Sequence, residues 1–329
     1  MRSVCLARSE KELNIVAIGG GHGLSGMLRG LKAYSSNITA IVTVADDGGG
    51  SGVLREDLRM LPPGDIRNCI LALANTEPTM EKLLNYRFTD GSLSGQSFGN
   101  LFLAAMNGIS SSFDEAVRKM GDVLAITGRV LPVTTSDVHL EAEFDNGQRT
   151  LGESKIFYAK KLNGSRIRRV RLVPENPPAL PESIEAIREA DLIVIGPGSL
   201  YTSIIPNFLV RGISQAVAKS KAPKIYVMNI MTQDGETEGY TGFEHVEAIL
   251  RHAPGTINAC IANNQPVEES LLERYRLDGV EPLVLERKKI EKLGIWVDEY
   301  PLATGTDYIR HDSARLADAI MEVYKQFGR

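Results

Sequence analysis

The sequence has few cysteines, no long apolar run and no excess of basic residues. Its three cysteines, Cys5, Cys69 and Cys260, lie far apart without metal-ligand spacing, which argues against a disulfide framework and is typical of reduced thiols in the cytoplasm. No stretch approaches the roughly 20 apolar residues that span a bilayer, so we expect no membrane insertion. A net charge of −4 disfavours general nucleic-acid binding, which needs a basic face.

Short motifs of several enzyme classes are also missing. The sequence contains no G-x-x-x-x-G-K-[ST] phosphate loop, no G-x-S-x-G nucleophile elbow and no H-E-x-x-H zinc motif. The first 13 residues lack the apolar segment of a signal peptide, and we expect them to form a flexible tail. With 43% hydrophobic residues, the part from 14 to 329 is long enough for a single composite nucleotide-binding domain.

Short apolar runs that alternate with helical stretches predict the fold. These Val- and Ile-rich runs lie at 14–19, 38–45, 191–199, 224–230 and 256–263. Near-continuous apolar strands are typical of parallel sheets that helices cover on both faces. The pattern therefore predicts a Rossmann-like, doubly wound α/β fold with a mostly parallel sheet.

The middle of the chain has a different pattern. From 64 to 122 the spacing is mostly helical, which predicts a helical insertion. From 123 to 173 the pattern alternates, and an Asn-Gly turn at 146–147 precedes "RTLGESKIFY" (149–158), so we expect a small antiparallel β extension. The two halves of the parallel sheet are expected at about 12–122 and 182–329.

A glycine-rich stretch, "GGGHGLSG" (19–26), follows the first predicted strand. Gly21, Gly23 and Gly26 match G-x-G-x-x-G at the start of a helix. Glycines let the backbone approach a phosphate, and the helix N-terminus offers free N–H groups. The stretch predicts a nucleotide or phosphate site in which His22 could donate a hydrogen bond. The alternative is a strand–helix turn that serves only close packing.

A second glycine-rich stretch, "VADDGGGSG" (44–52), follows the second predicted strand. Asp46 comes 20 residues after Gly26, where dinucleotide folds place an acid that binds ribose. That fold does not require Asp47, so the acid pair, with Gly49 and Ser51, suggests a second anion or an Mg²⁺ ion held together with phosphates. The alternative is an exposed Asp-rich turn.

Polar turns also follow the later strands. Their candidate ligand-binding residues are Gly196, Gly198, Ser199, Asn229, Thr232 and Asn263. Because the carboxyl ends of parallel strands meet at one edge of the sheet, these turns predict a ligand crevice. The amide of Asn263 could read the edge of a base there.

Four more residues are candidates on helical segments. Asp65 is expected to cap a helix whose first turn contains Arg67, which could face a phosphate. Asn100 opens an apolar helix that offers backbone N–H groups. Tyr275 could stack on a base or pack its own helix, and Arg310 could bind a ligand or simply precede the last helix.

Six motifs in this order resemble the phospholactate transferase-like (CofD-like) superfamily, and within it the gluconeogenesis factor branch of the YvcK type. They are "AIGGGHGLSGMLRGLK", "VTVADDGGGSGVLR", "GDIRNC", "GNLFLAAM", "IGPGSLYTSIIPN" and "MNIMTQDGETEGY", and they cover nearly the whole chain from about residue 14.

The resemblance implies a Rossmann-like fold with a crevice at the strand ends. In the transferase branch, a phospholactyl group moves from a nucleotide-activated donor with the help of Mg²⁺. The gluconeogenesis factor branch is associated with UDP-sugars such as UDP-N-acetylglucosamine and with cell shape and envelope synthesis, without a settled enzymatic activity. The resemblance to the superfamily implies nucleotide or metal positions at Gly20, Gly21, Gly23 and the Asp46–Asp47 pair. His22 departs from the commoner Thr, and "GGGSG" replaces "GGSSG", which removes one hydroxyl.

Three hypotheses follow. The first is a cytoplasmic, nucleotide-sugar-binding regulator without nucleic-acid partners. The second is a transferase in which Asp46 and Asp47 hold Mg²⁺ on a donor diphosphate and are the candidate catalytic residues. The third is an NAD-binding protein, from the G-x-G-x-x-G match and the 20-residue spacing. A homodimer is the default expectation for the assembly.

Overall fold

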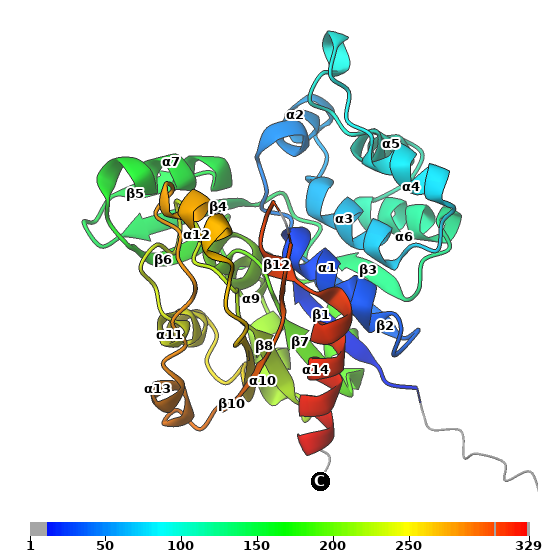
Figure 1. Ribbon diagram of the computed structural model, residues 1–329. Helices are drawn as coiled ribbons and strands as arrows, with labels where there is room; N and C mark the ends of the chain where they lie inside the picture. The colour runs from blue at the N-terminus through cyan, green and yellow to red at the C-terminus, as the bar shows by residue number, and fades with distance from the viewer. Residues whose placement is uncertain (1–11, 306, 328–329) are drawn as a thin grey trace, which may run out of the picture.

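Seven parallel strands form the central sheet of the computed structural model, which describes residues 12–305 and 307–327. Their order in the sheet is β10 (Trp296–Tyr300), β9 (Ala259–Asn263), β8 (Lys224–Val227), β7 (Leu192–Ile195), β1 (Ile15–Gly19), β2 (Ile38–Val42) and β3 (Arg129–Pro132) (Figure 1). β1, β2, β7 and β8 are buried along their whole length, as their apolar sequences predict. The Rossmann-like α/β prediction is confirmed.

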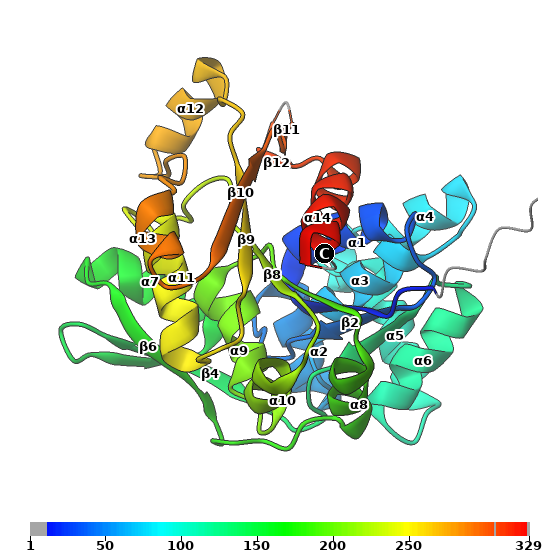
Figure 2. The same cartoon turned by 90° about the horizontal axis from the view of Figure 1, so that it is seen from below.

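Helices cover both faces of this sheet (Figure 2). α1 (Gly21–Leu31) and α14 (Ser313–Phe327) pack together over one face, while α8 (Pro181–Glu189) and α10 (Ile213–Lys219) lie over the opposite one. The short α9 (Ile205–Phe208) follows a π-helical turn, Leu200–Ile204. No helix in the described ranges is both long and apolar enough to cross a membrane.

The predicted helical insertion lies between β2 and β3. It consists of α2 (Gly49–Leu58), α3 (Gly64–Leu73), α4 (Pro78–Asn85), the short 3₁₀ turn Gly91–Leu93, α5 (Phe98–Gly108) and α6 (Phe113–Val123). α3 packs against α1 and against β2 and β3, so it connects the insertion to the sheet. The first turns of α2, α3 and α5 therefore lie beside the carboxyl edge of the sheet (Figure 1).

The antiparallel extension is a three-stranded sheet with β4 (His139–Phe144) between β5 (Arg149–Leu151) and β6 (Ile167–Val173). The predicted Asn-Gly turn joins β4 to β5. Two details of the prediction were wrong. β3 belongs to the parallel sheet, and the residues after β5 form a helix, α7 (Glu153–Asn163).

The change from strand to helix at residue 152 has a tertiary cause. Gly152 has a φ of +110°, which ends β5. The carboxylate of Asp47, from the second glycine-rich stretch, then accepts hydrogen bonds from the N–H groups of Glu153 and Ser154. These bonds satisfy donors that a helix N-terminus leaves free, and the alternating pattern of "ESKIFY" does not reveal them.

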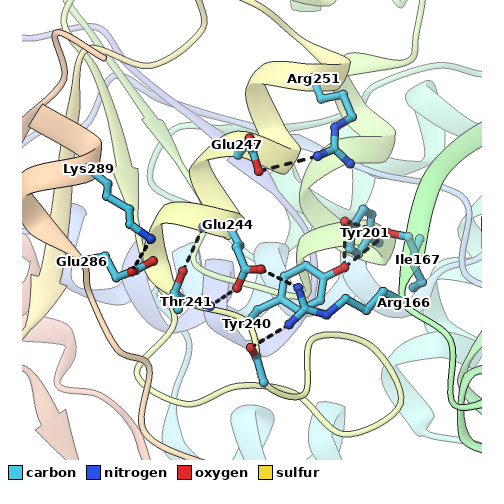
Figure 3. Close-up of polar contacts among 11 residues, drawn as sticks. Arg166, Ile167, Tyr201, Tyr240, Thr241, Glu244, Glu247, Arg251, Glu286 and Lys289 are labelled. Atoms are coloured by element: carbon cyan, nitrogen blue, oxygen red, sulfur yellow. Dashed lines mark hydrogen bonds and ion pairs between the residues drawn. The ribbon is translucent and has the colours of Figure 1, made fainter. Parts of the chain in front are cut away.

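A cluster of aromatic and charged side chains joins β6 to the second half of the chain (Figure 3). The hydroxyls of Tyr201 and Tyr240 donate to the carbonyl oxygen of Ile167, at 3.1 and 3.3 Å. Arg166 lies over the ring of Tyr240, 4.7 Å from its centroid, and pairs with Glu244 in the first turn of α11 (Gly242–His252). The extension is therefore tied to the core from both halves of the chain.

The remaining elements border the carboxyl edge of the sheet or extend from it. They are α12 (Glu269–Arg276), α13 (Arg287–Glu291), β11 (Ala303–Thr304) and β12 (Arg310–His311). β10 is a strand that the apolar runs did not predict, because its sequence "WVDEY" is only half-buried. Cys69 and Cys260 are buried free thiols, and Cys5 lies outside the described residues.

Candidate functional site

A cavity of about 450 Å³ opens at the carboxyl ends of β1, β7 and β8. β1 has β2 on one side and β7 on the other, so the cavity lies at the point where the order of the strands reverses. Open α/β sheets bind ligands at this switch point. Nine predicted residues line the cavity: Gly21, His22, Gly23, Gly198, Ser199, Asn229, Thr232, Tyr275 and Arg310.

The first glycine-rich stretch forms one wall. Gly20 is extended, and Gly21 has a φ of +68°, so the chain turns sharply from β1 into α1. A Cβ on Gly23 would lie 2.6 Å from the carbonyl oxygen of Pro197, so the two turns touch and only glycine fits. The residue before α1, Gly20, has no side chain to cap it. Asp65 accepts from the N–H of Gly21, and the other N–H groups of the first turn are left for a ligand.

Asn229 and Ser199 fix the opposite wall through hydrogen bonds of their own. The amide of Asn229 accepts from the N–H of Gly198 at 3.1 Å and donates to its carbonyl at 2.8 Å. Ser199 donates to Gln233 at 2.7 Å. Thr232 is buried and accepts from the N–H of Glu281 at 2.9 Å. Asn229 and Thr232 therefore stabilise the shape of the cavity through bonds to the backbone.

Positive charge borders the cavity although the whole chain is acidic. Arg29 and Arg310 line the cavity and are exposed. Burial lowers the pKa of His22, and the positive charges of Arg310, Arg67 and Arg29 lower it further. The imidazole of His22 can donate a hydrogen bond and lies among these positive charges, so this wall suits a negatively charged ligand group.

One side of the cavity is apolar. Ile230 and Met231 line it and belong to a small hydrophobic cluster against which Tyr275 and Ile309 pack. The hydroxyl of Tyr275 accepts from the N–H of Ile309 at 2.8 Å and holds the segment before Arg310. An apolar, aromatic side next to a cationic one suits a base or sugar joined to a phosphate.

Asp46 and Asp47 do not line the cavity, and their oxygens bind N–H and O–H groups. Asp46 accepts from the N–H of Gly48 at 2.8 Å and from the hydroxyl of Ser51. Both oxygens of Asp47 accept from the first turn of α7, at 2.8 and 3.1 Å. Within residues 12–305 and 307–327, no group of three or more His, Cys, Asp or Glu is placed to hold a metal ion.

A cluster of carboxyl groups lies near this acid pair. Burial and the charge of Asp46 raise the pKa of Asp65 to about 7. Burial and the charges of Asp46, Glu236, Asp47 and Asp65 raise the pKa of Glu153 to about 8. Burial raises the pKa of Glu236 to about 7, against hydrogen bonds from the N–H groups of Tyr201 and Thr202.

Sequence reasoning misplaced Asp65 and Asn263. Pro63 precedes α3 as its cap residue, and Asp65 lies inside the first turn, where it accepts a hydrogen bond from the N–H of Gly21. The Asn263 side-chain oxygen accepts from the N–H groups of Gln265, Leu302 and Ala303. Its amide therefore holds the chain after β9 and is not free to read a base.

The other candidates lie beside the cavity and do not line it. Gly20, Gly49, Ser51 and Gly196 shape the turns, and Arg67 and Asn100 are buried in the first turns of α3 and α5. Gly26, the third glycine of the G-x-G-x-x-G match, also lines the cavity, whereas the lining residues Arg29, Ser203 and His311 were not among the predicted ligand-binding residues. The spacing of 22, 26 and 29 is helical and could have revealed Arg29.

Known proteins and a solved structure resemble this chain over nearly its whole length. The family model described as 2-phospho-L-lactate transferase CofD matches residues 15–303. A protein of Thermoanaerobacterium thermosulfurigenes is 57% identical over 93% of this chain and 95% of its own length. The gluconeogenesis factor of Bacillus subtilis is 45% identical, with 95% of this chain and 98% of that protein covered. A crystal structure of a UPF0052 family protein from Bacillus halodurans superposes with a TM-score of 0.91 at 42% identity, over 95% of this chain and 100% of that one.

Proposed function

The chain belongs to the 2-phospho-L-lactate transferase CofD family, and from this membership we propose that it is a nucleotide-sugar-binding regulatory protein. The observation that carries the proposal is the cavity at the switch point of the sheet. One wall offers the glycine-rich turn and two arginines, and another offers Tyr275 with an apolar cluster. A diphosphate on the first wall and a base or sugar on the second would use both.

UDP-N-acetylglucosamine is the proposed ligand. The diphosphate would accept hydrogen bonds from N–H groups in the first turn of α1 and from the imidazole of His22, and it would pair with Arg29 and Arg310. Ser199 and Gln233 would supply hydroxyl and amide groups for the sugar. None of these roles requires bond breaking, which fits a protein that senses a nucleotide sugar.

The role in the cell is part of the same proposal. Relatives at 44–45% identity bear the name gluconeogenesis factor. We propose that this protein supports cell shape and envelope synthesis, in the cytoplasm, when carbon comes from gluconeogenic sources. Expression in a Bacillus subtilis strain that lacks its gluconeogenesis factor should restore growth on such a carbon source, and a Gly23→Ala variant should not.

A transferase of the phospholactyl type is the second candidate, because the matching family model carries that description. Such a reaction would need Mg²⁺ next to the diphosphate. The acid pair does not fit this ion, since both oxygens of Asp47 and one of Asp46 accept backbone N–H groups. We therefore rank transfer below binding and derive no step through a metal.

NAD binding has less support. The dinucleotide hypothesis relied on Asp46 as the acceptor for a ribose hydroxyl. Asp46 does not line the cavity, and its carboxylate already accepts from Gly48 and Ser51. The G-x-G-x-x-G match alone does not distinguish NAD from other nucleotides.

A binding experiment separates the three candidates. The full chain would be titrated calorimetrically with UDP-N-acetylglucosamine, GDP and NAD, each with and without Mg²⁺, and its melting temperature measured in parallel. We expect the UDP-sugar to bind and stabilise the protein without metal. GDP binding that needs Mg²⁺ would support the transferase, and stabilisation by NAD alone would contradict the proposal.

A further inference from the structure

Arg67 is a buried cation without a partner. Only 8% of its surface is exposed, and its Nε–H group has no hydrogen-bond acceptor. No carboxylate in the described ranges lies within ion-pairing distance of its guanidinium. A buried, unpaired charge destabilises the fold, because desolvation is not compensated. Such a group is expected where a ligand completes its contacts.

The stem of Arg67 lies against the first turn of α5. A Cβ on Gly99 would be 3.0 Å from Cδ and 3.2 Å from Cγ of Arg67, so the glycine leaves room for this side chain. Asn100, the next residue, is 3% exposed, and its side-chain oxygen also lacks a partner. α5 has 11 residues, and the positive end of its dipole lies here. Ser97 accepts from the N–H of Asn100 and Tyr86 accepts from that of Phe98, so the N–H of Gly99 is the one left for an anion in this turn.

A second arginine adds positive charge at the same place. Arg87 is exposed. Burial lowers the pKa of Arg67, and the positive charge of Arg87 lowers it further. Its Nη1 donates to the carbonyl oxygen of Gly95, which brings no negative charge. Asp65, two residues before Arg67, accepts from Gly21 and so is directed to the first glycine-rich stretch. The charge of Asp65 acts on Arg67, but no carboxylate of the described residues forms an ion pair with either arginine.

We propose that Arg67, Arg87 and the first turn of α5 form a second anion subsite that binds a phosphate group. This subsite goes beyond the proposed function and does not depend on it. A guanidinium offers two parallel N–H donors to a phosphate, and a dianion would neutralise both arginines. Asp65, in the same turn of α3 as Arg67, lies 2.5 Å from the place of a Cβ on Gly20, so this turn is next to the first glycine-rich stretch. The phosphate could belong to a second small molecule or to a distal group of the nucleotide ligand.

Calorimetric titration of the full chain with inorganic phosphate tests the subsite. Arg67→Met keeps most of the stem and removes the charge, and it should weaken phosphate binding at least tenfold. Arg67→Lys keeps the charge but loses the planar guanidinium, so its phosphate affinity should lie between those of the wild type and Arg67→Met. Arg118→Met, at an exposed position on α6 paired only with Asp114, is the matched control and should bind as the wild type does. Equal phosphate affinity in Arg67→Met and the wild type would overturn the proposal.

Stability supplies a readout that a merely structural arginine would not give. In phosphate-free buffer, Arg67→Met should melt at a higher temperature than the wild type, because it removes an uncompensated buried charge. Added phosphate should stabilise the wild type and not the variant. A lower melting temperature for Arg67→Met without phosphate would show that Arg67 holds the fold together, and would overturn the proposal.

A third titration, with phosphate and UDP-N-acetylglucosamine together, shows where the phosphate group comes from and whether the subsite is independent of the nucleotide cavity. If phosphate and UDP-N-acetylglucosamine bind together, the subsite takes a separate molecule; if they compete and Arg67→Met weakens both, the group belongs to the nucleotide ligand. Arg67-dependent phosphate binding without any UDP-sugar binding would refute the proposed function and support the subsite. Phosphate binding that Gly23→Ala abolishes and Arg67→Met leaves intact would place the phosphate on the first glycine-rich turn and overturn the inference.

Discussion

The two glycine-rich stretches, residues 19–26 and 44–52, follow adjacent strands and look alike in sequence, but they have different partners. The first lies against the turn at Pro197 and leaves the N-terminus of α1 facing a cavity. The second uses the carboxylate of Asp47 to hold the N-terminus of α7. A glycine-rich turn after a strand therefore identifies a ligand site only when no other segment of the chain occupies its donors and acceptors.

The electrostatic surroundings of the two stretches differ in the same way. Burial shifts the pKa of His22 in the first stretch and of Glu153 beside the second; in addition, arginines lower the pKa of His22, whereas carboxylates raise that of Glu153. An anionic ligand is favoured by the first environment and disfavoured by the second. Variants in each stretch should therefore affect different properties: ligand binding for the first, and folding stability for the second.

The largest expected effect is on binding at the first stretch. Gly23→Ala would place a Cβ 2.6 Å from the oxygen and 2.8 Å from the carbon of the Pro197 carbonyl, so one wall of the cavity must move. We expect UDP-N-acetylglucosamine to bind about 100-fold more weakly by calorimetry, a loss of nearly 3 kcal/mol. Gly108→Ala, where a Cβ has no neighbour within 4 Å, is the control. Equal affinities in the two variants would refute the role of this turn.

The next effect is the pH dependence of stability near the second stretch. The pKa values of Asp65, Glu153 and Glu236 are raised to about 7, 8 and 7. The folded protein thus keeps protons that the unfolded chain releases near its ordinary carboxyl pKa. Their contribution is complete at acidic pH and is lost as the pH rises through about 7 to 8, so we expect stability to fall between pH 5 and pH 8.

Glu236→Gln tests this pH dependence. The change in unfolding free energy between pH 5 and pH 8, measured with urea, should shrink by at most roughly 3 kcal/mol, because one raised pKa is removed. Glu56→Gln, at an exposed position on α2, should leave the change as in the wild type. An unaltered pH profile in Glu236→Gln would contradict the assignment.

A smaller effect is expected from Asp47→Ala. The variant removes the acceptor for two N–H groups of α7 and should lower the unfolding free energy by about 1–2 kcal/mol, as loss of a helix cap does. Ligand affinity should change by no more than about twofold, with or without Mg²⁺. The matched control is Asp57→Ala, an exposed acid on α2. Loss of Mg²⁺-dependent binding at unchanged stability would instead favour the transferase.

The smallest effect concerns the rim of the cavity. Tyr275→Phe removes the acceptor for the N–H of Ile309, a bond worth about 0.5–1.5 kcal/mol, and loosens the segment that carries Arg310. We expect about threefold weaker binding of the UDP-sugar by calorimetry. Tyr308→Phe, at an exposed neighbouring position, should bind normally. If both variants bind equally, the rim does not depend on this bond.

Much of the fold could be predicted because the strands are locally distinctive. The apolar runs identified β1, β2, β7, β8 and β9, and periodicity identified the helical insertion. β10 and α7 could not be identified so easily. β10 lies at the edge of the sheet and is only partly buried, and α7 begins where a carboxylate from residue 47 accepts its first N–H groups. Neither property is local in sequence.

The candidate site divides in the same way. Glycine spacing identified Gly21 and Gly23, and strand order placed Gly198 and Ser199 at the same edge. Side-chain chemistry was a weaker guide, since a free amide and a fully bonded one look identical in sequence. Asn263 is the clearest example, because its amide is bonded to the backbone of Gln265, Leu302 and Ala303.

The sequence by itself determined that this chain builds a parallel sheet with glycine-rich turns at its carboxyl edge, since apolar runs and glycine positions act locally. Only the tertiary structure decided which turn remains open to a ligand, because that depends on segments far apart in the chain. Pro197 contacts Gly23 at the wall of the cavity, and the N–H of Glu153 binds the carboxylate of Asp47 at the other turn. Long-range pairing also decides the surroundings of Arg67. Asp65 accepts from the N–H of Gly21 in another part of the chain, and the Nε–H of Arg67 has no acceptor.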